Sequence, residues 1–428
     1  MSAWEGGMAV FSSSGTATEI PLVAEPEVFS RAALAALASE ARAILSGAVK
    51  LARALLAQGN ECDSRMLSAP FEGLEAEAMS RLFEDAPCPA IVARIDFLSE
   101  GANFAPRALE LNATIPAMPA YGDLAAQAWI RAAARARGMA PRQADDLIVA
   151  CGSNMENLRR ALAAFYRSRG GTKERPSIAL VARPGDAQQG ELRRLAEHFR
   201  QLGHRAATLT PDECEPEGWD VLYRHIWAHN TPPESPFAAA LRAPHRFVLA
   251  NPVNGVLEVK GLFARLSECG EDLHLARLAG LDDAELAAAR RLPLTRLLDE
   301  ALAPRVVAER ERWVLKRNWG YGGKGVRIGS EIAPAAWAGE VNAALADRAG
   351  GGFVAQERVI SVPRSGTRVS RGGIERLPLC HDVSTYTGLG PFVPSGSVVR
   401  ASSSPVVNLL GGGGLVPVLP EDVAAALA

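Results

Sequence analysis

The 428-residue chain has few cysteines, and they form no recognised motif. The six cysteines are scattered, and no two of them stand in a C-x-x-C pair. Cysteine-based zinc sites usually contain closely spaced pairs, and disulfide frameworks are typical of small, cysteine-rich secreted domains. We therefore expect a reduced, cytoplasmic protein whose fold depends on neither a disulfide network nor a structural zinc ion.

The marks of nucleic-acid-binding, membrane and secreted proteins are also missing. The formal net charge is −2, so there is no basic excess to bind a phosphate backbone. No run approaches 18 consecutive apolar residues, which argues against a membrane span. The first residues include Glu5 and lack a basic region followed by an apolar core, so no signal peptide is expected. We expect a soluble protein with neither a nucleic-acid nor a membrane partner.

The length of the chain predicts two or three domains that share an interface. Residues 1–28 are rich in Ser, Gly, Thr and Pro and are expected to form an irregular arm. Residues 29–172 predict helices and a strand hairpin. Alternating strands and helices over 173–255 predict a small parallel α/β unit. Residues 256–428 predict helices, a glycine-rich loop and further strands, so the fold class is α/β with α+β elements.

The first group of candidate functional residues lies on the hairpin predicted within 91–112. Alternate residues of a strand share a face, so Arg94 and Asp96 point one way, as do Glu110 and Asn112 on the returning strand. Two carboxylates and an amide form an all-oxygen set that suits Mg²⁺. An arginine beside them can hold a phosphate or a carboxylate. A solvent-facing strand with surface ion pairs explains the same pattern equally well.

The second group is a lysine on a predicted strand, Lys316, followed by a glycine-rich loop. The loop contains Gly320, Gly322, Gly323 and Gly325. Glycines allow positive φ and let backbone N–H groups approach phosphate oxygens. The loop satisfies G-x-G-x-x-G, but a strand rather than a helix is predicted next, and the Walker pattern fails. A flap over a nucleotide is predicted, with an ordinary hairpin turn as the alternative.

The third group is the apolar segment 352–360, which is interrupted by Gln356 and Glu357. A strand of this kind offers backbone groups and a carboxamide to an adenine edge. By itself the segment predicts only a strand.

Two histidine-containing segments are weak candidates for a zinc site or a catalytic triad. His225 and His229 have i, i+4 spacing but lack the glutamate of H-E-x-x-H, so a structural or substrate-side role is favoured over zinc. Cys380, His381 and Asp382 are consecutive, and neighbours in the chain rarely face one another, which disfavours a catalytic triad. His381 or Asp382 remains a candidate base in a substrate pocket.

Taken together, the three groups resemble the ATP-grasp superfamily. In the usual order the lysine strand and glycine flap come first and the metal-binding residues last. Here the order is reversed, as in the circularly permuted ATP-grasp proteins, including the glutathionylspermidine synthase group, in which R-x-D precedes E-x-N by a short loop. The match covers about 85–125 and 310–420, and Lys260 after Asn251-Pro252 resembles a nucleotide-contacting lysine of the family.

The resemblance implies a role for each matching residue. Asp96, Glu110 and Asn112 would hold Mg²⁺, and Arg94 would steady the transferring phosphoryl group. The residues implied for ATP binding are Lys260, Lys316, Gly320, Tyr321, Gly322, Gly323, Lys324, Gly325, Gln356, Glu357 and Val359. Arg400 and Asn408 are candidates for holding the substrate carboxylate or its phosphate.

The implied activity is that of an ATP- and Mg²⁺-dependent ligase that joins a carboxylate to an amine through an acyl phosphate. The partners would be a small-molecule or peptide acid and an amine, and a homodimer is possible. Two alternatives stay open. One is a nucleotide-binding protein without ligase activity, and the other is a kinase-like enzyme that releases a phosphorylated product.

Overall fold

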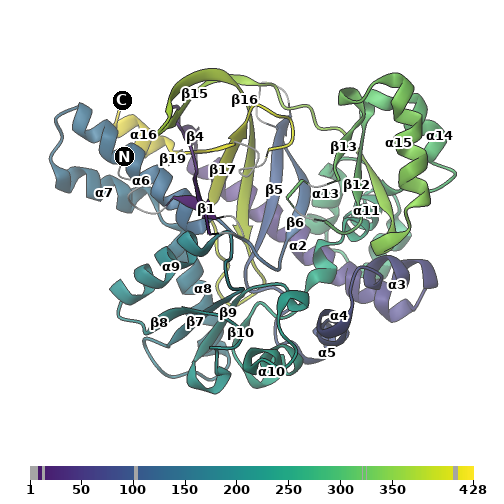
Figure 1. Cartoon of the computed structure of the whole chain (residues 1–428), viewed down its shortest axis with the longest axis horizontal. Helices are drawn as coiled ribbons and strands as arrows, with labels where there is room; N and C mark the ends of the chain where they lie inside the picture. The colour runs from purple at the N-terminus through teal and green to yellow at the C-terminus, as the bar shows by residue number, and fades with distance from the viewer. Residues whose placement is uncertain (1–7, 12–14, 101–104, 321, 324, 408–412) are drawn as a thin grey trace.

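The structure is a computed structural model and describes residues 8–11, 15–100, 105–320, 322–323, 325–407 and 413–428. Its largest element is a seven-stranded sheet of order β15-β3-β18-β17-β16-β5-β6. In that order the strands are β15 (Arg364–Ser370), β3 (Leu22–Val23), β18 (Gly414–Val416), β17 (Ser397–Ser402), β16 (Gly373–Thr387), β5 (Ala93–Glu100) and β6 (Ala105–Asn112). Figure 1 shows this central sheet between a smaller sheet below it and a lid at the right.

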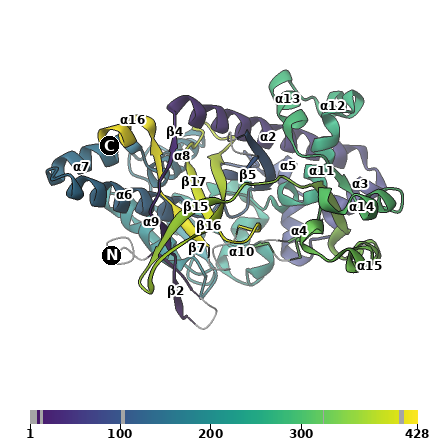
Figure 2. The same cartoon turned by 90° about the horizontal axis from the view of Figure 1, so that it is seen from above.

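The two faces of the central sheet have different roles. Val383 and Val399 point to the face covered by α2 (Arg31–Gln58), where they join one core cluster. Figure 2 shows α2 lying along this face. The opposite face carries Tyr386 and Val398, which pack near α6 (Pro119–Ala136) in another cluster. Since side chains alternate along a strand, the polar residues of the predicted site lie on this second face.

The small unit is a parallel sheet of order β10-β9-β7-β8, as the alternating pattern predicts. Its strands are β7 (Ile178–Ala182), β8 (Ala206–Leu209), β9 (Val221–His225) and β10 (Leu249–Ala250). One side is covered by α8 (Asn154–Ser168) and α9 (Gln189–Gln201), and the other by α4 (Gly73–Met79) and α10 (Pro236–Arg242). Short apolar strands with helices on both sides are typical of a parallel sheet.

The lid is an antiparallel sheet of order β11-β14-β12-β13. Its strands are β11 (Thr295–Leu297), β12 (Trp313–Arg317), β13 (Arg327–Ile328) and β14 (Phe353–Glu357). Trp313 and Phe353 pack against α14 (Ala303–Ala308) and α15 (Pro334–Ala346). The alternate residues, including Lys316 and Gln356, therefore point to the other face, toward the central sheet.

The remaining elements connect or extend these three parts. They are α3 (Glu61–Ser68), α5 (Leu82–Asp85), α7 (Pro141–Cys151), α11 (Lys260–Cys269), α12 (Leu273–Ala279), α13 (Asp283–Arg291), α16 (Glu421–Ala426), β1 (Ala9–Phe11), β2 (Ala17–Glu19), β4 (Glu27–Phe29) and β19 (Val418–Pro420). The segment 256–303 is mainly helical and also contains the short strand β11.

The expectation of an irregular arm over 1–28 is wrong for the residues that the structure describes there. β1 and β2 pair with each other, β3 joins the central sheet, and β4 pairs with β19. Strands of two or three residues are too short to show a detectable alternation. β3 and β4 form because their partners β15, β18 and β19, far away in sequence, supply the hydrogen bonds.

Among the residues that the structure describes, one helix, α2, is long and apolar enough by composition to cross a membrane, with a mean hydropathy of 1.4 over an 18-residue window. Buried residues such as Leu37, Ile44 and Leu55 pack in the core beside the central sheet. A buried core helix meets the same criterion of length and composition. The absence of a membrane partner stays a prediction.

The small sheet is tied to the central sheet by Asn251, which follows β10. Its side-chain oxygen accepts from the backbone N–H groups of Ile91 (2.7 Å) and Val92 (3.0 Å). Its amide nitrogen donates to the carbonyls of Val92 (2.6 Å) and Ala113 (2.6 Å). The full hydrogen-bonding capacity of the amide is used in a fully buried position. These bonds place the carboxyl edge of the small sheet beside the ends of the hairpin that carry Arg94 and Asn112.

Replacing Asn251 by alanine is expected to lower the free energy of unfolding by about 3 kcal/mol, because several buried backbone groups lose their partners. Urea denaturation of the purified variant measures this. Asn230→Ala serves as the control, since Asn230 is exposed and its loss is expected to cost less than about 0.5 kcal/mol. Equal stability of the two variants would contradict the role given to Asn251.

Candidate active site

A cavity of about 210 Å³ lies between the central sheet and the lid. Its lining includes the predicted site residues Arg94, Asp96, Glu110, Asn112, Lys260, Lys316, Gly320, Gly322, Gly323, Gln356, Glu357, Val359 and Arg400. Gly325 is not among the lining residues. Tyr321, Lys324 and Asn408 lie outside the described residues. The fold therefore brings together hairpin and lid residues that are about 200 positions apart in sequence.

The hairpin has the register that the alternation predicts. Arg94 lies opposite Asn112, and Asp96 lies opposite Glu110. The pairing shifts after Asp96, which marks a bulge next to the site. Arg94 and Asp96 are buried, whereas Glu110 and Asn112 are partly exposed. A solvent-facing strand with surface ion pairs, the alternative explanation, is therefore wrong for Arg94 and Asp96.

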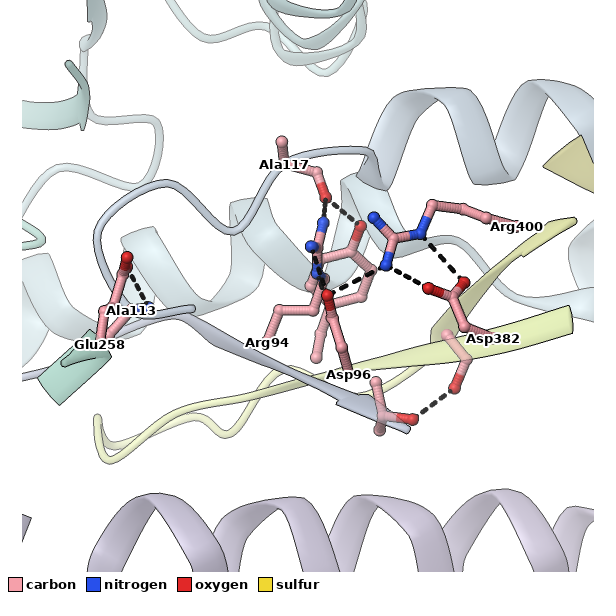
Figure 3. Close-up of polar contacts among 10 residues, drawn as sticks. Arg94, Asp96, Ala113, Ala117, Glu258, Asp382 and Arg400 are labelled. Atoms are coloured by element: carbon pink, nitrogen blue, oxygen red, sulfur yellow. Dashed lines mark hydrogen bonds and ion pairs between the residues drawn. The ribbon is translucent and has the colours of Figure 1, made fainter. Parts of the chain in front are cut away.

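A network of two arginines and two aspartates occupies one end of the cavity (Figure 3). Arg94 donates to both carboxylate oxygens of Asp96, through Nε (2.8 Å) and Nη2 (2.9 Å). Arg400 donates through Nη2 to Asp96 (3.0 Å) and through Nε and Nη2 to Asp382. Arg94 also donates through Nη1 to the carbonyl of Ala117 (3.0 Å). The network spans the adjacent strands β5, β16 and β17.

Burial and the arginines have opposite effects on the pKa values of the two aspartates. Burial opposes ionisation of Asp96, but Arg94 and then Arg400 outweigh it and hold the pKa of Asp96 below its usual value. For Asp382, burial is the larger effect and raises its pKa, and Arg400 opposes the rise only in part. Arg400 already binds the carboxylate of Asp382. This contact competes with the predicted role of Asp382 as a base.

The residues predicted to hold Mg²⁺ fit that ion in part. Both oxygens of Asp96 accept from guanidinium groups, so this ligand is engaged. The carboxylate of Glu110 lies 3.8 Å from Lys260 Nζ, and the buried Nδ2 of Asn112 has no hydrogen-bond partner among the described residues. The described part of the chain holds no group of three His, Cys, Asp or Glu side chains arranged for a metal. Mg²⁺ usually binds one or two protein carboxylates beside phosphates and waters, so Glu110 and Asn112 would fit the ion only together with such additional ligands.

The lysines predicted to contact phosphates lie on the opposite wall. Lys316 is buried, and its Nζ donates to Gln356 Oε1 at 2.6 Å. The amide nitrogen of Gln356 donates to Thr295 Oγ1 at 3.1 Å and to the carbonyl of Leu109 at 3.3 Å. Gln356 therefore orients Lys316, and its amide groups are already engaged within the protein. Lys260 Nζ donates to the carbonyl of Gly320 (2.8 Å) at the start of the glycine loop.

The glycine loop has the backbone that only glycine adopts without strain. Gly322, Gly323 and Gly325 have φ values of 68°, 72° and 78°. A Cβ atom on Gly323 would lie 2.8 Å from Val406 Cγ1, so the loop closely approaches the segment after β17. Before the loop, Asn318 is fully buried and accepts from Gly261 N–H (2.7 Å). The loop thus begins at a fixed anchor and continues over the cavity.

The affinity for nucleotide is expected to decrease as the pH rises above 8. Burial, with a contribution from Lys260, lowers the pKa of Lys316 to about 8, so the ammonium loses its proton above that pH. Phosphate binding favours the ammonium, and recapturing a proton costs up to about tenfold in affinity per pH unit. Titration of a fluorescent ATP analogue from pH 7 to 9.5 measures the effect. Lys316→Arg keeps its charge and should flatten the profile, and a flat wild-type profile would contradict the prediction.

The histidines do not converge on the cavity. His225 Nε2 lies 2.8 Å from Gln188 Oε1, and His229 Nδ1 lies 2.7 Å from the buried carboxylate of Glu75. His381 Nδ1 lies 3.0 Å from Glu27, on the face of the sheet opposite Asp382. These contacts agree with the structural or substrate-side role expected for His225 and His229. Of the two candidate bases, only Asp382 lines the cavity.

Glu258 supports the edge of the site from behind, and none of the sequence motifs includes it. Its carboxylate accepts from the backbone N–H groups of Ala113 (2.6 Å) and Thr114, directly after Asn112. Burial raises the pKa of Glu258 to about 7. Figure 3 shows Glu258 against this turn. A single acid in an otherwise apolar run, Val256 to Val259, was the signal that could have identified it.

Among solved structures, the chain is similar to a glutathione synthetase-like effector (GSS30) from Globodera pallida, determined in its apo form. The TM-score is 0.59 and the identity 12%, and the match covers 98% of this chain and 94% of that one. This chain therefore shares its mixed α/β fold with that structure. No protein-family profile and no curated protein matches its sequence. The ATP-grasp-like fold that the motifs predicted is supported, whereas the permuted order stays a prediction.

Proposed function

We propose that the chain is an ATP- and Mg²⁺-dependent ligase with a circularly permuted ATP-grasp fold that joins a carboxylate to an amine. The observation that carries the proposal is the cavity between sheet and lid. There the lysine Lys316 and the glycine loop face a buried arginine pair and the Glu110–Asn112 edge. A solved structure with a similar fold is described as a glutathione synthetase-like effector. That description agrees with amide formation and concerns the other protein, so it does not identify this chain's substrates.

The chemistry proceeds in two steps. A substrate carboxylate attacks the γ-phosphorus of ATP, the bond to the β-phosphate breaks, and ADP leaves with the electron pair. An amine then attacks the acyl carbon and expels inorganic phosphate. Negative charge gathers on oxygen in both steps, and fixed cationic donors stabilise it in a site closed to water.

The residues divide this work among themselves. Lys316 and Lys260 contact the ATP phosphates, and the glycine loop closes over them to exclude water. The backbone of Glu357 and Val359 contacts adenine, since the Gln356 amide is engaged with Lys316. Arg94 and Arg400 lie where the transferring phosphoryl group passes.

The metal would be held by Glu110 and Asn112 together with the ATP phosphates, with Asp96 as a further ligand if its arginine contacts open. When bound, Mg²⁺ neutralises phosphate charge and polarises the transferred group. The chain's own contribution is to fix the Glu110–Asn112 edge through the β5–β6 register and the Glu258 cap on the following turn.

One observation favours a second candidate, a nucleotide-binding protein without ligase activity. Both oxygens of Asp96 are bound by arginines, so the predicted set of metal ligands is incomplete in this conformation. A protein that holds ATP without activating a carboxylate would show this feature permanently. Turnover, rather than binding, therefore separates the two candidates.

Hydroxylamine trapping tests the proposal. The protein is incubated with Mg-ATP, hydroxylamine and a panel of amino acids and short peptides, and hydroxamate is measured. A hydroxamate that requires ATP and is lost in Asp96→Asn supports a ligase and identifies the acid. ATP binding without hydroxamate from any acid in the panel would instead support the binding protein.

A further inference from the structure

Arg400 on β17 is held by two carboxylates, one from the neighbouring strand β16 and one from β5, the next strand beyond β16. Asp382 on β16 lies directly opposite Arg400 in the register and binds its Nε at 3.0 Å and also its Nη2. Asp96 on β5 accepts from the same Nη2 at 3.0 Å. The exposed fractions of the three side chains are 12%, 7% and 5%. Such a buried set leaves the guanidinium little freedom to rotate.

The two arginines differ in what they leave available. Arg94 uses Nε, Nη1 and Nη2 in contacts with Asp96 and Ala117. Arg400 uses Nε and Nη2, and among the described residues none accepts from its Nη1. Figure 3 shows this nitrogen of Arg400 without a dashed line. Each Nη carries two N–H groups, so Arg94 keeps one on each Nη, whereas Arg400 keeps both on Nη1. Arg400 also lines the cavity, so its Nη1 can present two N–H groups to a ligand there.

We propose that Asp382 is a positioning residue, which holds Arg400 so that Nη1 binds the phosphoryl group during its transfer from ATP to the carboxylate. The inference rests on the proposed ligase function. No proton moves in this step: the bond from the carboxylate oxygen to the γ-phosphorus forms, and the bond to ADP breaks. Asp382 therefore serves the first step of the reaction instead of acting as a base for the amine.

The charges explain why the effect should be on turnover. Two arginines and two aspartates sum to zero, so the network has little attraction for a carboxylate that arrives with a single charge. Charge spreads over the phosphoryl oxygens as transfer proceeds, and a donor already fixed in place needs no reorganisation to meet it. An interaction made mainly in the transition state lowers kcat when removed and leaves KM nearly unchanged.

The test compares Asp382→Asn, Arg400→Ala and the double variant in the hydroxamate assay. Asp382→Asn is expected to lower kcat by about 10- to 100-fold, as for a misplaced catalytic group, with KM for ATP and acid within about threefold. Asp382→Glu should recover part of the loss. The double variant should have a kcat less than about twofold below that of Arg400→Ala alone, because the two residues act as a unit. If the losses in kcat of the two single variants multiply in the double variant, or if KM alone changes, the inference is overturned.

A matched control separates positioning from general destabilisation. Glu285 does not line the cavity. Its side chain is 3% exposed, and its carboxylate lies 2.7 Å from Lys50 Nζ. Glu285→Gln therefore removes a charge that is about as buried as that of Asp382. Its kcat should stay within about twofold of wild type when both proteins are assayed well below their unfolding temperatures. A loss in Glu285→Gln as large as that in Asp382→Asn would attribute the effect to stability and overturn the inference.

An activity-independent measurement keeps the two proposals apart. Orthovanadate is titrated into the Mg-ADP complex of each variant by calorimetry, since vanadate resembles the transferring phosphoryl group. Wild type is expected to bind it, and Asp382→Asn and Arg400→Ala should each bind about tenfold more weakly. If wild type forms no hydroxamate but shows this ranking, the ligase proposal fails, and what stands is that Asp382 positions Arg400 to bind a phosphoryl group. Equal vanadate affinity in the three proteins, or no binding by wild type, would overturn the positioning role.

Discussion

Lys316→Ala is expected to lower kcat/KM for ATP-dependent hydroxamate formation by about 100- to 1000-fold, the usual effect of removing one donor to developing oxyanion charge. Lys316 is buried and is the strand lysine that lies across the cavity from the Arg94–Asp96 network. Its partner Gln356 keeps the ammonium in one place. Loss of the side chain therefore removes a positive charge that the protein holds in a fixed position.

Two further variants make this result specific. Lys316→Arg keeps the charge but not the geometry, and it should retain more ATP affinity than Lys316→Ala. Lys173→Ala removes a lysine that is 63% exposed and paired with Asp220 on the small unit, so its activity should equal that of wild type. Normal turnover in Lys316→Ala would remove Lys316 from the site and with it the predicted nucleotide-binding mode.

Asp96→Ala is expected to have the largest effect on stability, about 3–5 kcal/mol, because it leaves two buried guanidinium groups without one of their counter-charges. Arg94 loses its only carboxylate partner among the described residues, while Arg400 retains Asp382. Urea denaturation at pH 7 measures the change.

The pH dependence of the same effect gives an independent check. The pKa of Asp96 is below its usual value in the folded protein, so its stabilising contribution is present above the unfolded-state pKa and is lost as the pH falls through the folded-state pKa. The stability difference between wild type and Asp96→Ala should therefore narrow at acid pH. Asp96→Asn keeps the volume of the side chain but not its charge, so its free energy of unfolding should lie between those of wild type and Asp96→Ala. Equal stability of Asp96→Ala and wild type at pH 7 would contradict the network as described.

Local sequence patterns were sufficient to predict those parts of the fold and the site that depend on one short segment. The two-residue period of a strand was enough to place Arg94, Asp96, Glu110 and Asn112 on one face, because alternation is a property of the extended backbone itself. The glycine loop was predictable for the same reason, since its positive φ values demand glycine at those positions. The parallel α/β unit followed from alternating apolar strands and amphipathic helices.

Tertiary structure alone decided which of these groups meet and what they bind when they do. The sequence pattern does not show that Arg400 shares Asp96 and Asp382, that Gln356 holds Lys316, or that β3 and β4 find partners near the end of the chain. Each of these contacts joins residues far apart in sequence, and a hydrogen bond across such a distance depends on the packing of whole sheets. The sequence by itself determined the kind of chemistry available on each segment, whereas the packing of the lid against the central sheet determined which side chains share a cavity.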